Sequence, residues 1–373
     1  MKKVLFFIHD LRGGGAEKVL VNLVNNMDYS KFDVTVMSLF DVGENKKALR
    51  HEVHYKFIYK KVFRGNQHYM KLFTPEQLHK KYIKDFYDIE IAYLEGPCAR
   101  IISGCQNKDT KLVSWIHCTM KSKEQVSGAF RSYSEAAECY KRFDKMAFVS
   151  KDTQNCFVRY CNVNSNMCVL YNTNETEQIL RDSKEPVKEI KDDGSFKLVG
   201  TGKLEKLKGF DRLIRIQKKL LDDGYKTQTY ILGKGSEEDN LRKLAEDLGI
   251  TDSVQLLGYQ SNPHKYVAKC DLFVCASFSE GFSTAATEAL IVGTPVCTVE
   301  VSGMKEMLGE NNEYGVVTEN SEEALYEGIK MLLDNPDLLA HYKKQAGIRG
   351  SMFSTATTVK EVENMLIQLS GGC

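Results

Sequence analysis

The sequence lacks any long apolar run, since no window approaches the roughly eighteen apolar residues that a membrane-spanning helix needs. Its first residues, MKKVLFFI, are followed at once by His9 and Asp10, so this apolar stretch is too short for the core of a signal peptide. Together these absences predict a cytoplasmic protein that is at most peripheral to the inner face of the cell membrane.

The sequence also lacks an excess of charge of one sign. Its 51 Lys and Arg and 50 Asp and Glu leave a net charge of +1, which argues against a dedicated nucleic-acid-binding protein. Residues 1–170 nevertheless carry 27 basic and 18 acidic side chains, and the remainder carries 24 and 32. The basic half indicates contact with something anionic, such as a membrane surface or a phosphorylated acceptor. Two halves that merely complement each other are the alternative.

Recognisable metal and disulfide patterns are missing as well. The 11 cysteines are scattered without a Cys-x-x-Cys pair or a His/Cys cluster, so neither a zinc site nor a disulfide framework is indicated. No Asp-x-Asp pair stands at the end of a predicted strand to hold a divalent ion. We expect no metal and no cofactor.

What the sequence does contain is strand and helix alternation on both sides of a polar stretch. Short apolar runs followed by segments of helical composition predict parallel sheets of the doubly wound α/β type. At 373 residues the chain is long enough for two such domains, facing each other across a cleft. We place the first domain at residues 1–173, a linker at 174–195 and the second domain at 196–355.

Residues 270–300, CDLFVCASFSEGFSTAATEALIVGTPVCTVE, join a buried-strand run, a glycine loop and a helix. Glu280 follows the strand and Glu288 lies in the helix. The carboxyl ends of parallel strands form a crevice that favours anions, and carboxylates beside it can accept hydrogen bonds from the hydroxyls of a sugar nucleotide. The alternative is a solvated helix residue and a loop charge.

Other strand ends carry candidate ligands. Lys203 and Lys208 follow the strand at 196–201, where cations can neutralise a diphosphate leaving group; Lys206 between them reads as an exposed lysine. His117 ends the run KLVSWI and can contact a substrate, although on spacing alone a structural histidine is the alternative. Glu95, at the end of the preceding strand, is a second candidate for the acceptor side.

Residues 53–84 are dense in Lys, Arg, His, Tyr and Phe. Such interleaving suits a surface that lies on anionic lipid, because aromatic rings enter the headgroup region while the cations stay in water. We expect residues 60–84 to dock at the cytoplasmic leaflet. An ordinary strand followed by a solvated helix and loop is the alternative.

The segment FSEGFSTAATEALIVGTPV resembles the donor-site motif of the retaining GT-B glycosyltransferases, most closely family four, many of which build bacterial surface polysaccharides such as capsules. The resemblance covers nearly the whole chain and is strongest at residues 196–310. It implies that Glu280 binds donor-sugar hydroxyls and Glu288 the ribose. It also implies that the backbone of the loop after Glu280 stabilises the leaving diphosphate; this loop comprises Gly281, Phe282 and Ser283.

Elsewhere the same resemblance implies further contacts. The glycines after the first strand, Gly14 and Gly15, approach the donor diphosphate, although they are not the G-x-G-x-x-G fingerprint of dinucleotide-binding proteins. The match of SWIHC to the family's histidine puts His117 near the donor sugar and the attacking hydroxyl. The nucleobase meets the backbone of Gly258 and Tyr259.

The resemblance also shows one position where this sequence differs from the family, and it implies where the last helix lies. Lys203 stands where the family usually has Arg, which affects bidentate recognition of phosphate but not the neutralisation of its charge. The last helix, at residues 356–373, is implied to cross back towards the first domain.

These features together predict a metal-independent, retaining hexosyl- or N-acetylhexosaminyltransferase. Its donor is a nucleotide-diphosphate sugar, with a UDP-sugar preferred, and its acceptor is a glycan or a polyprenyl-diphosphate-linked glycan. Two alternatives stay open. One is a sugar-nucleotide epimerase on the same fold, and the other is a catalytically silent sugar-nucleotide-binding or scaffold subunit.

Overall fold

The computed structural model describes residues 1–161, 163 and 166–371, apart from the side chain of Gln67. The chain forms two compact units: unit 1 comprises Met1–Asn174 and Thr355–Cys373, and unit 2 comprises Glu175–Ser354. Of the predicted linker, residues 174–195, Asn174 lies in unit 1 and the rest in unit 2, where residues 176–182 form a helix. Residues 372 and 373 of the predicted last helix lie outside the described residues.

Unit 1 is built on a seven-stranded sheet in the order β3-β2-β1-β4-β5-β6-β7, and each neighbouring pair is parallel. The strands are β1 (Lys2–Ile8), β2 (Phe32–Phe40), β3 (His54–Tyr59), β4 (Ile89–Ala92), β5 (Lys111–Ile116), β6 (Lys145–Phe148) and β7 (Asn166–Val169). Its helices are α1 (Gly15–Asn25), η1 (Asn45–Ala48), α2 (Asn66–Lys71), α3 (Pro75–Tyr82), α4 (Pro97–Ile102), α5 (Lys123–Ser127), α6 (Tyr133–Lys141), α7 (Lys151–Tyr160) and α16 (Thr355–Leu369).

Unit 2 is built on a six-stranded parallel sheet in the order β10-β9-β8-β11-β12-β13. The strands are β8 (Phe196–Thr201), β9 (Thr227–Leu232), β10 (Val254–Gly258), β11 (Leu272–Cys275), β12 (Val296–Val299) and β13 (Val316–Thr318). Its helices are α8 (Thr176–Asp182), η2 (Lys206–Lys208), α9 (Phe210–Asp222), α10 (Glu238–Asp247), α11 (His264–Lys269), α12 (Thr284–Ile291), α13 (Met304–Leu308), α14 (Glu322–Asp334) and α15 (Pro336–Met352).

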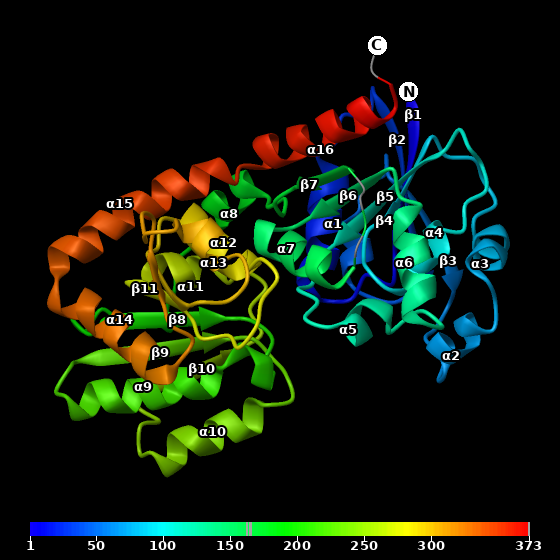
Figure 1. Cartoon of the computed structure of the whole chain (residues 1–373). Helices are drawn as coiled ribbons and strands as arrows, with labels where there is room; N and C mark the ends of the chain where they lie inside the picture. The colour runs from blue at the N-terminus through cyan, green and yellow to red at the C-terminus, as the bar shows by residue number, and fades with distance from the viewer. Residues whose placement is uncertain (162, 164–165, 372–373) are drawn as a thin grey trace. The chain divides into compact units, whose positions relative to one another are not determined.

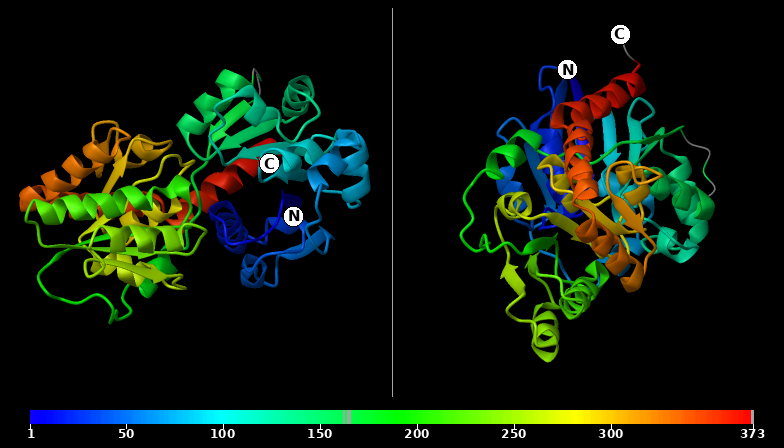
Figure 2. Two further views of the ribbon diagram at one scale, coloured as in Figure 1. Left: turned by 90° about the horizontal axis from the view of Figure 1, so that it is seen from below. Right: turned by 90° about the vertical axis from the view of Figure 1, so that its left-hand side faces the viewer.

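Helices lie on both faces of each sheet (Figure 1, Figure 2). The central strands are therefore covered on both sides, which is why they read as continuous apolar runs in the sequence. Each unit has a hydrophobic cluster of its own, one formed entirely by residues of unit 1 and the other by residues of unit 2. The predicted pair of doubly wound parallel α/β domains is confirmed.

The last helix, α16, belongs to unit 1 (red in Figure 1). Within this unit the Glu363 carboxylate accepts a hydrogen bond of 2.6 Å from the backbone N–H of Asp28. Of the helices in the described part of the chain, none is long and apolar enough to cross a membrane.

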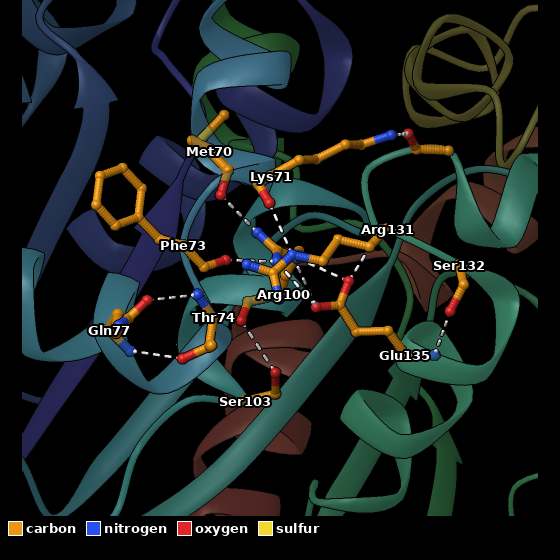
Figure 3. A network of polar contacts seen from close by, with 11 residues as sticks. Met70, Lys71, Phe73, Thr74, Gln77, Arg100, Ser103, Arg131, Ser132 and Glu135 are labelled. Carbon is orange, nitrogen blue, oxygen red and sulfur yellow. Dashed lines mark hydrogen bonds and ion pairs between the residues drawn. The ribbon is translucent and has the colours of Figure 1, made fainter.

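A buried arginine fixes the segment between α2 and α3. Arg100 of α4 donates hydrogen bonds to the carbonyl oxygens of Met70 and Phe73, at 2.9 and 2.8 Å, and pairs with Glu135 of α6 (Figure 3). Satisfying the guanidinium in this way removes most of the cost of burying it. The turn that carries Leu72 is therefore tied to two helices of the unit.

Each sheet has one point where the order of connection reverses, at β1/β4 in unit 1 and at β8/β11 in unit 2. Loops that leave neighbouring strands there run in opposite directions, which opens a crevice at the carboxyl ends. In unit 2 the loops at this point are residues 202–209 and 276–283. These are the loops that carry Lys203, Lys208 and Glu280.

The first of these loops reaches the second through a glycine. Gly209 has φ +64°, and a Cβ atom on it would lie 2.1 Å from the carbonyl oxygen of Ala276. The Phe278 N–H also donates to the carbonyl of Leu207 at 2.8 Å. Both the backbone conformation and the close approach require glycine at this position.

We predict that Gly209→Ala destabilises the protein more than Gly224→Ala. Gly224 also has positive φ, +87°, but no atom lies within 4 Å of its ideal Cβ. The control should therefore lose only the conformational cost of about 1 to 2 kcal/mol. Gly209→Ala should lose about 1 to 3 kcal/mol more through steric overlap. Denaturant unfolding of both variants measures the difference, and equal losses would contradict the close approach.

Candidate active site

In unit 2 the two loops at the β8/β11 switch point bring a cation and a carboxylate together. The Lys208 Nζ lies 2.7 Å from the Glu280 Oε1, and the Ser277 hydroxyl donates to the same oxygen at 2.7 Å. Lys208 is 29% exposed at its side chain and Glu280 only 10%, so the pair lies at the rim of the protein interior. The arrangement fixes a carboxylate where the crevice of the sheet opens.

Lys203 lies elsewhere. Its ammonium pairs with Glu205 at 2.5 Å, and its side chain is 65% exposed. Lys203 and Lys208 look alike in the sequence but differ in their surroundings: Lys203 pairs with Glu205, and Lys208 pairs with Glu280. A phosphate role for Lys203 stays a prediction.

The loop from Gly281 to Ser283 is held from two sides. The Ser283 hydroxyl caps α12 by accepting a hydrogen bond from the Ala286 N–H at 3.3 Å. Gly303 has φ +77°, and a Cβ there would lie 2.9 Å from the Gly281 carbonyl oxygen. The Phe282 side chain is buried and packs edge-to-face on Phe353. Phe282 can therefore meet a ligand through its backbone and not through its ring.

Glu288 of α12 has a neighbour that the sequence did not reveal. The Nδ1 atom of His264, at the start of α11, lies 3.7 Å from the Glu288 Oε2, and both side chains are largely buried. Farther along the same edge, Gly258 ends β10 with φ +69° and Tyr259 is exposed. Contacts of Glu288, Gly258 and Tyr259 with a nucleoside stay predictions.

In unit 1, His117 follows β5. Its backbone N–H donates to the Glu95 carboxylate at 2.9 Å, and its ring packs on the rings of Tyr93 and Trp115, with centroids 4.7 and 6.0 Å away. The buried Nε2 atom makes no hydrogen bond within the described residues. Burial lowers the pKa of His117 to about 3, so the imidazole is neutral at physiological pH. The hydrogen bond from the His117 backbone places the two acceptor-side candidates, Glu95 and His117, next to each other.

The glycine turn before α1 is covered by a carboxylate. Gly14 is the N-cap of α1, and a Cβ on it would lie 2.0 Å from the Glu17 Oε2. Burial raises the pKa of Glu17. Its carboxyl group faces this turn, where the sequence predicts that a diphosphate approaches Gly14 and Gly15. The roles of the two glycines stay predictions.

Asp10 and Arg12, which precede this glycine turn, form an ion pair that the sequence did not predict. The Asp10 carboxylate is buried and receives hydrogen bonds from the His9 ring and, in a bidentate arrangement, from the Arg12 guanidinium at 3.0 and 2.8 Å. Burial opposes ionisation of Asp10, but the hydrogen bonds from His9 and Arg12 outweigh it and lower its pKa. The position of Asp10 at the end of a strand was the available signal.

The chain matches two family models. The model described as Glycosyltransferase Family 4 matches residues 13–178, and the one described as Glycosyl transferases group 1 matches residues 182–349. A Campylobacter jejuni relative is 28% identical over 375 residues, covering 98% of this chain and 100% of that protein. It is named N-acetylgalactosamine-N,N'-diacetylbacillosaminyl-diphospho-undecaprenol 4-alpha-N-acetylgalactosaminyltransferase.

Solved structures show the same fold. HepE from Anabaena, in complex with UDP, superposes with a TM-score of 0.79 at 18% identity and covers 98% of this chain and 100% of its own. The apo lipopolysaccharide outer core galactosyltransferase WaaB has a TM-score of 0.72 at 17% identity, with 98% and 99% covered. The chain is a glycosyltransferase of the GT-B fold that resembles family four.

The two units of this glycosyltransferase carry sites of different electrostatic character. Unit 2 offers an ammonium group beside a carboxylate at a switch point, and unit 1 offers a neutral imidazole beside the Glu95 carboxylate. An ammonium group stabilises developing negative charge, whereas a carboxylate and a neutral ring bind hydroxyls without adding positive charge. The first set suits a diphosphate sugar and the second an acceptor.

We predict that His117 makes the glycosyltransferase less stable as the pH falls below about 6.5. Its folded pKa of about 3 lies below the usual value near 6.5, so the unfolded chain takes up the proton first. Between pH 6 and 4 this one group should cost about 1.4 kcal/mol for each pH unit. Denaturant unfolding of wild type and His117→Gln against pH should show a shallower slope for the variant.

The matched control is His51→Gln, because the His51 side chain is 93% exposed. This variant removes one imidazole from the chain without touching the buried site. Parallel pH profiles for wild type and His117→Gln would contradict a neutral, buried imidazole in unit 1.

Proposed function

We propose that this glycosyltransferase is a retaining enzyme that moves a hexosyl or N-acetylhexosaminyl group from a UDP-sugar to a polyprenyl-diphosphate-linked glycan. The reaction serves the assembly of bacterial surface polysaccharide, such as a capsule. The contact between Lys208 and Glu280 at the switch point of unit 2 carries this proposal. The Campylobacter jejuni relative, which is named for an undecaprenol-linked acceptor, and the UDP complex of HepE support it.

In this proposal Glu280 accepts hydrogen bonds from donor-sugar hydroxyls while Lys208 faces the diphosphate. An ammonium group has three N–H donors, so Lys208 can keep its bond to Glu280 and still donate to phosphate oxygens. Lys208 supplies the positive charge that a divalent ion provides in other transferases, so the reaction needs no metal and no cofactor. The backbone of the Gly281–Ser283 loop and Lys203, both in unit 2, add to this stabilisation.

The chemical step exchanges one bond at the anomeric carbon for another on the same face of the sugar. The bond to the diphosphate oxygen breaks as the acceptor hydroxyl oxygen bonds to that carbon, and the acceptor proton passes to the leaving phosphate oxygen. Glu95 orients the acceptor by accepting a hydrogen bond. The neutral His117 lies beside it and adds no positive charge there.

We predict that UDP raises the thermal midpoint of the protein more than GDP, ADP or CMP. At a hundred times its dissociation constant a ligand stabilises a protein by about 2.7 kcal/mol, which is readily detected. Lys208→Ala should abolish the shift and Lys206→Ala, at an exposed lysine of the same loop, should keep it. A shift of equal size in Lys208→Ala would remove this residue from the donor site.

Turnover assays separate the remaining possibilities. Consumption of the UDP-sugar only in the presence of a lipid-linked acceptor supports a transferase, whereas a changed sugar without any acceptor would indicate an epimerase. If the protein binds UDP but turns over no donor, the remaining alternative is a catalytically silent sugar-nucleotide-binding or scaffold subunit.

Membrane contact through residues 60–84 is the second part of this proposal. The structure forms β3 just before this segment and α2 and α3 within it, so the backbone is close to the alternative of a strand followed by a helix and loop, with a second helix in place of part of the loop. Several apolar side chains there and beside it are nevertheless exposed, and Leu72 is 74% exposed on the turn that Arg100 holds. Six lysines lie in the same segment of the chain. A rigid apolar side chain among cations suits the headgroup region of an anionic leaflet.

The lysines of this segment are not equivalent. The Lys71 ammonium donates to the Gly128 carbonyl, and Lys81 donates to the Tyr69 hydroxyl while packing on the Phe73 ring. Changing either of them would disturb the unit itself. Lys60, Lys61 and Lys80 are exposed and are the better choice for testing charge.

We predict that changing Lys60, Lys61 and Lys80 to Glu weakens binding to anionic liposomes by at least roughly 100-fold, because each cation near the surface contributes about 1 kcal/mol. Co-sedimentation measures the change. The control changes three exposed lysines of unit 2, Lys243, Lys343 and Lys344, to Glu. Equal loss in both triple variants would show that net charge, and not this surface, governs binding.

A further inference from the structure

A glutamate is buried in the middle of the unit 1 sheet. Glu90 lies on β4, paired with Leu5 of β1 on one side and Leu112 of β5 on the other, and it is 2% exposed. A carboxylate in such a place loses its hydration, which is costly unless neighbouring groups compensate for it. Two polar side chains from other elements of the unit contact it.

These neighbours are a histidine and a cysteine. The His79 Nε2, from α3, lies 2.7 Å from the Glu90 Oε2. The Cys105 Sγ, just after α4, lies 4.0 Å from the other carboxylate oxygen, and Cys105 is also buried. One nitrogen, one oxygen and one sulfur atom thus lie within 4.8 Å of one another. Among the described residues no other group of His, Cys, Asp and Glu forms such a set.

The backbone holds these three side chains in place. Gly104 lets the turn before Cys105 touch the start of α3, since a Cβ on it would lie 2.0 Å from the Pro75 carbonyl oxygen. The same end of α3 is fixed by a capping box between Thr74 and Gln77. The cluster is therefore assembled by a helix, a strand and a turn that pack closely, and not by one flexible loop.

The chemistry of the set favours one class of ligand. Imidazole nitrogen, thiolate sulfur and carboxylate oxygen are the atoms that bind Zn²⁺, whereas Mg²⁺ and Ca²⁺ prefer oxygen alone. Tetrahedral Zn²⁺ with bonds of about 2.0 to 2.3 Å holds nitrogen and oxygen ligands roughly 3.3 Å apart and sulfur and oxygen roughly 3.6 Å apart. The His79 Nε2 lies 2.7 Å from the Glu90 Oε2 and the Cys105 Sγ lies 4.0 Å from the Glu90 Oε1, each within about half an ångström of the separation that zinc requires. Because these are two different oxygens, a small rotation of the carboxylate brings one of them to both partners.

We propose that His79, Glu90 and Cys105 bind a structural zinc ion that fastens α3 to the central sheet of unit 1. The thiol and the protonated imidazolium form of His79 each give up one proton to solvent when the ion binds, so the ligands are a thiolate and a neutral imidazole. The ion replaces the hydrogen bond between His79 and Glu90. The fourth ligand is water, which reaches the cluster where the His79 side chain is 13% exposed. This site is independent of the proposed donor site and takes no part in sugar transfer.

The test is a titration of the metal-free full-length chain with Co²⁺, which replaces Zn²⁺ and reports its ligands by absorption. We expect one equivalent to produce a near-ultraviolet thiolate charge-transfer band and the visible bands of tetrahedral cobalt. Cys105→Ser should lose the charge-transfer band, and His79→Gln should bind at least tenfold more weakly. Cys139→Ser, which alters another buried thiol of unit 1, should behave as wild type.

Thermal unfolding gives a second readout that does not depend on the spectrum. Zn²⁺ should raise the midpoint of wild type and Cys139→Ser and leave that of Cys105→Ser unchanged, with circular dichroism showing that all three are folded. If Cys105→Ser does not fold, His79→Gln takes its place. Absence of the cobalt bands in wild type, or identical bands in Cys105→Ser, would overturn the proposal and leave a buried ion pair.

Discussion

The close approach of the Gly209 backbone to the Ala276 carbonyl is the constraint on which the unit 2 site depends. It brings the turn that ends in Lys208 against the loop that leaves β11, and there the ammonium meets Glu280 at 2.7 Å. A side chain at residue 209 would keep the two loops apart. The Lys208–Glu280 ion pair is only partly exposed, and such pairs near the surface contribute modestly by themselves, so the backbone packing fixes the geometry of the two charges.

The same principle organises unit 1 with different side chains. There the reversal of strand order lies between β1 and β4, and the loops that leave β1, β4 and β5 carry Asp10, Glu95 and His117. Charge is balanced locally, because Arg12 neutralises Asp10 while His117 stays neutral through burial. In each unit the strand ends determine where the candidate side chains lie, and the local environment determines how those side chains are protonated.

The parts of this structure that could be predicted from the sequence are those with a local pattern of apolar and polar residues. Buried strands, the helix after Glu280 and the loops at strand ends were visible as apolar runs broken by glycine, and helix α15, with no strong apolar stripe, was missed. Pairing between loops was not visible. Lys203 and Lys208 look equivalent in the chain, and their difference arises from the fold around Gly209. The contact of His264 with Glu288 joins two residues that lie 24 positions apart in helices α11 and α12, and no sequence pattern indicates it.

The cluster around Glu90 shows the same limit more sharply. Scattered cysteines exclude the local metal motifs, in which ligands lie two to four residues apart along one loop. They do not exclude ligands at positions 79, 90 and 105, because a parallel sheet brings a strand and the helices beside it together whatever their spacing. A buried carboxylate in a sheet centre is costly, so its persistence there requires a compensating charge. A histidine supplies part of that compensation here, and the adjacent thiol is the reason to look for a metal ion that supplies the rest.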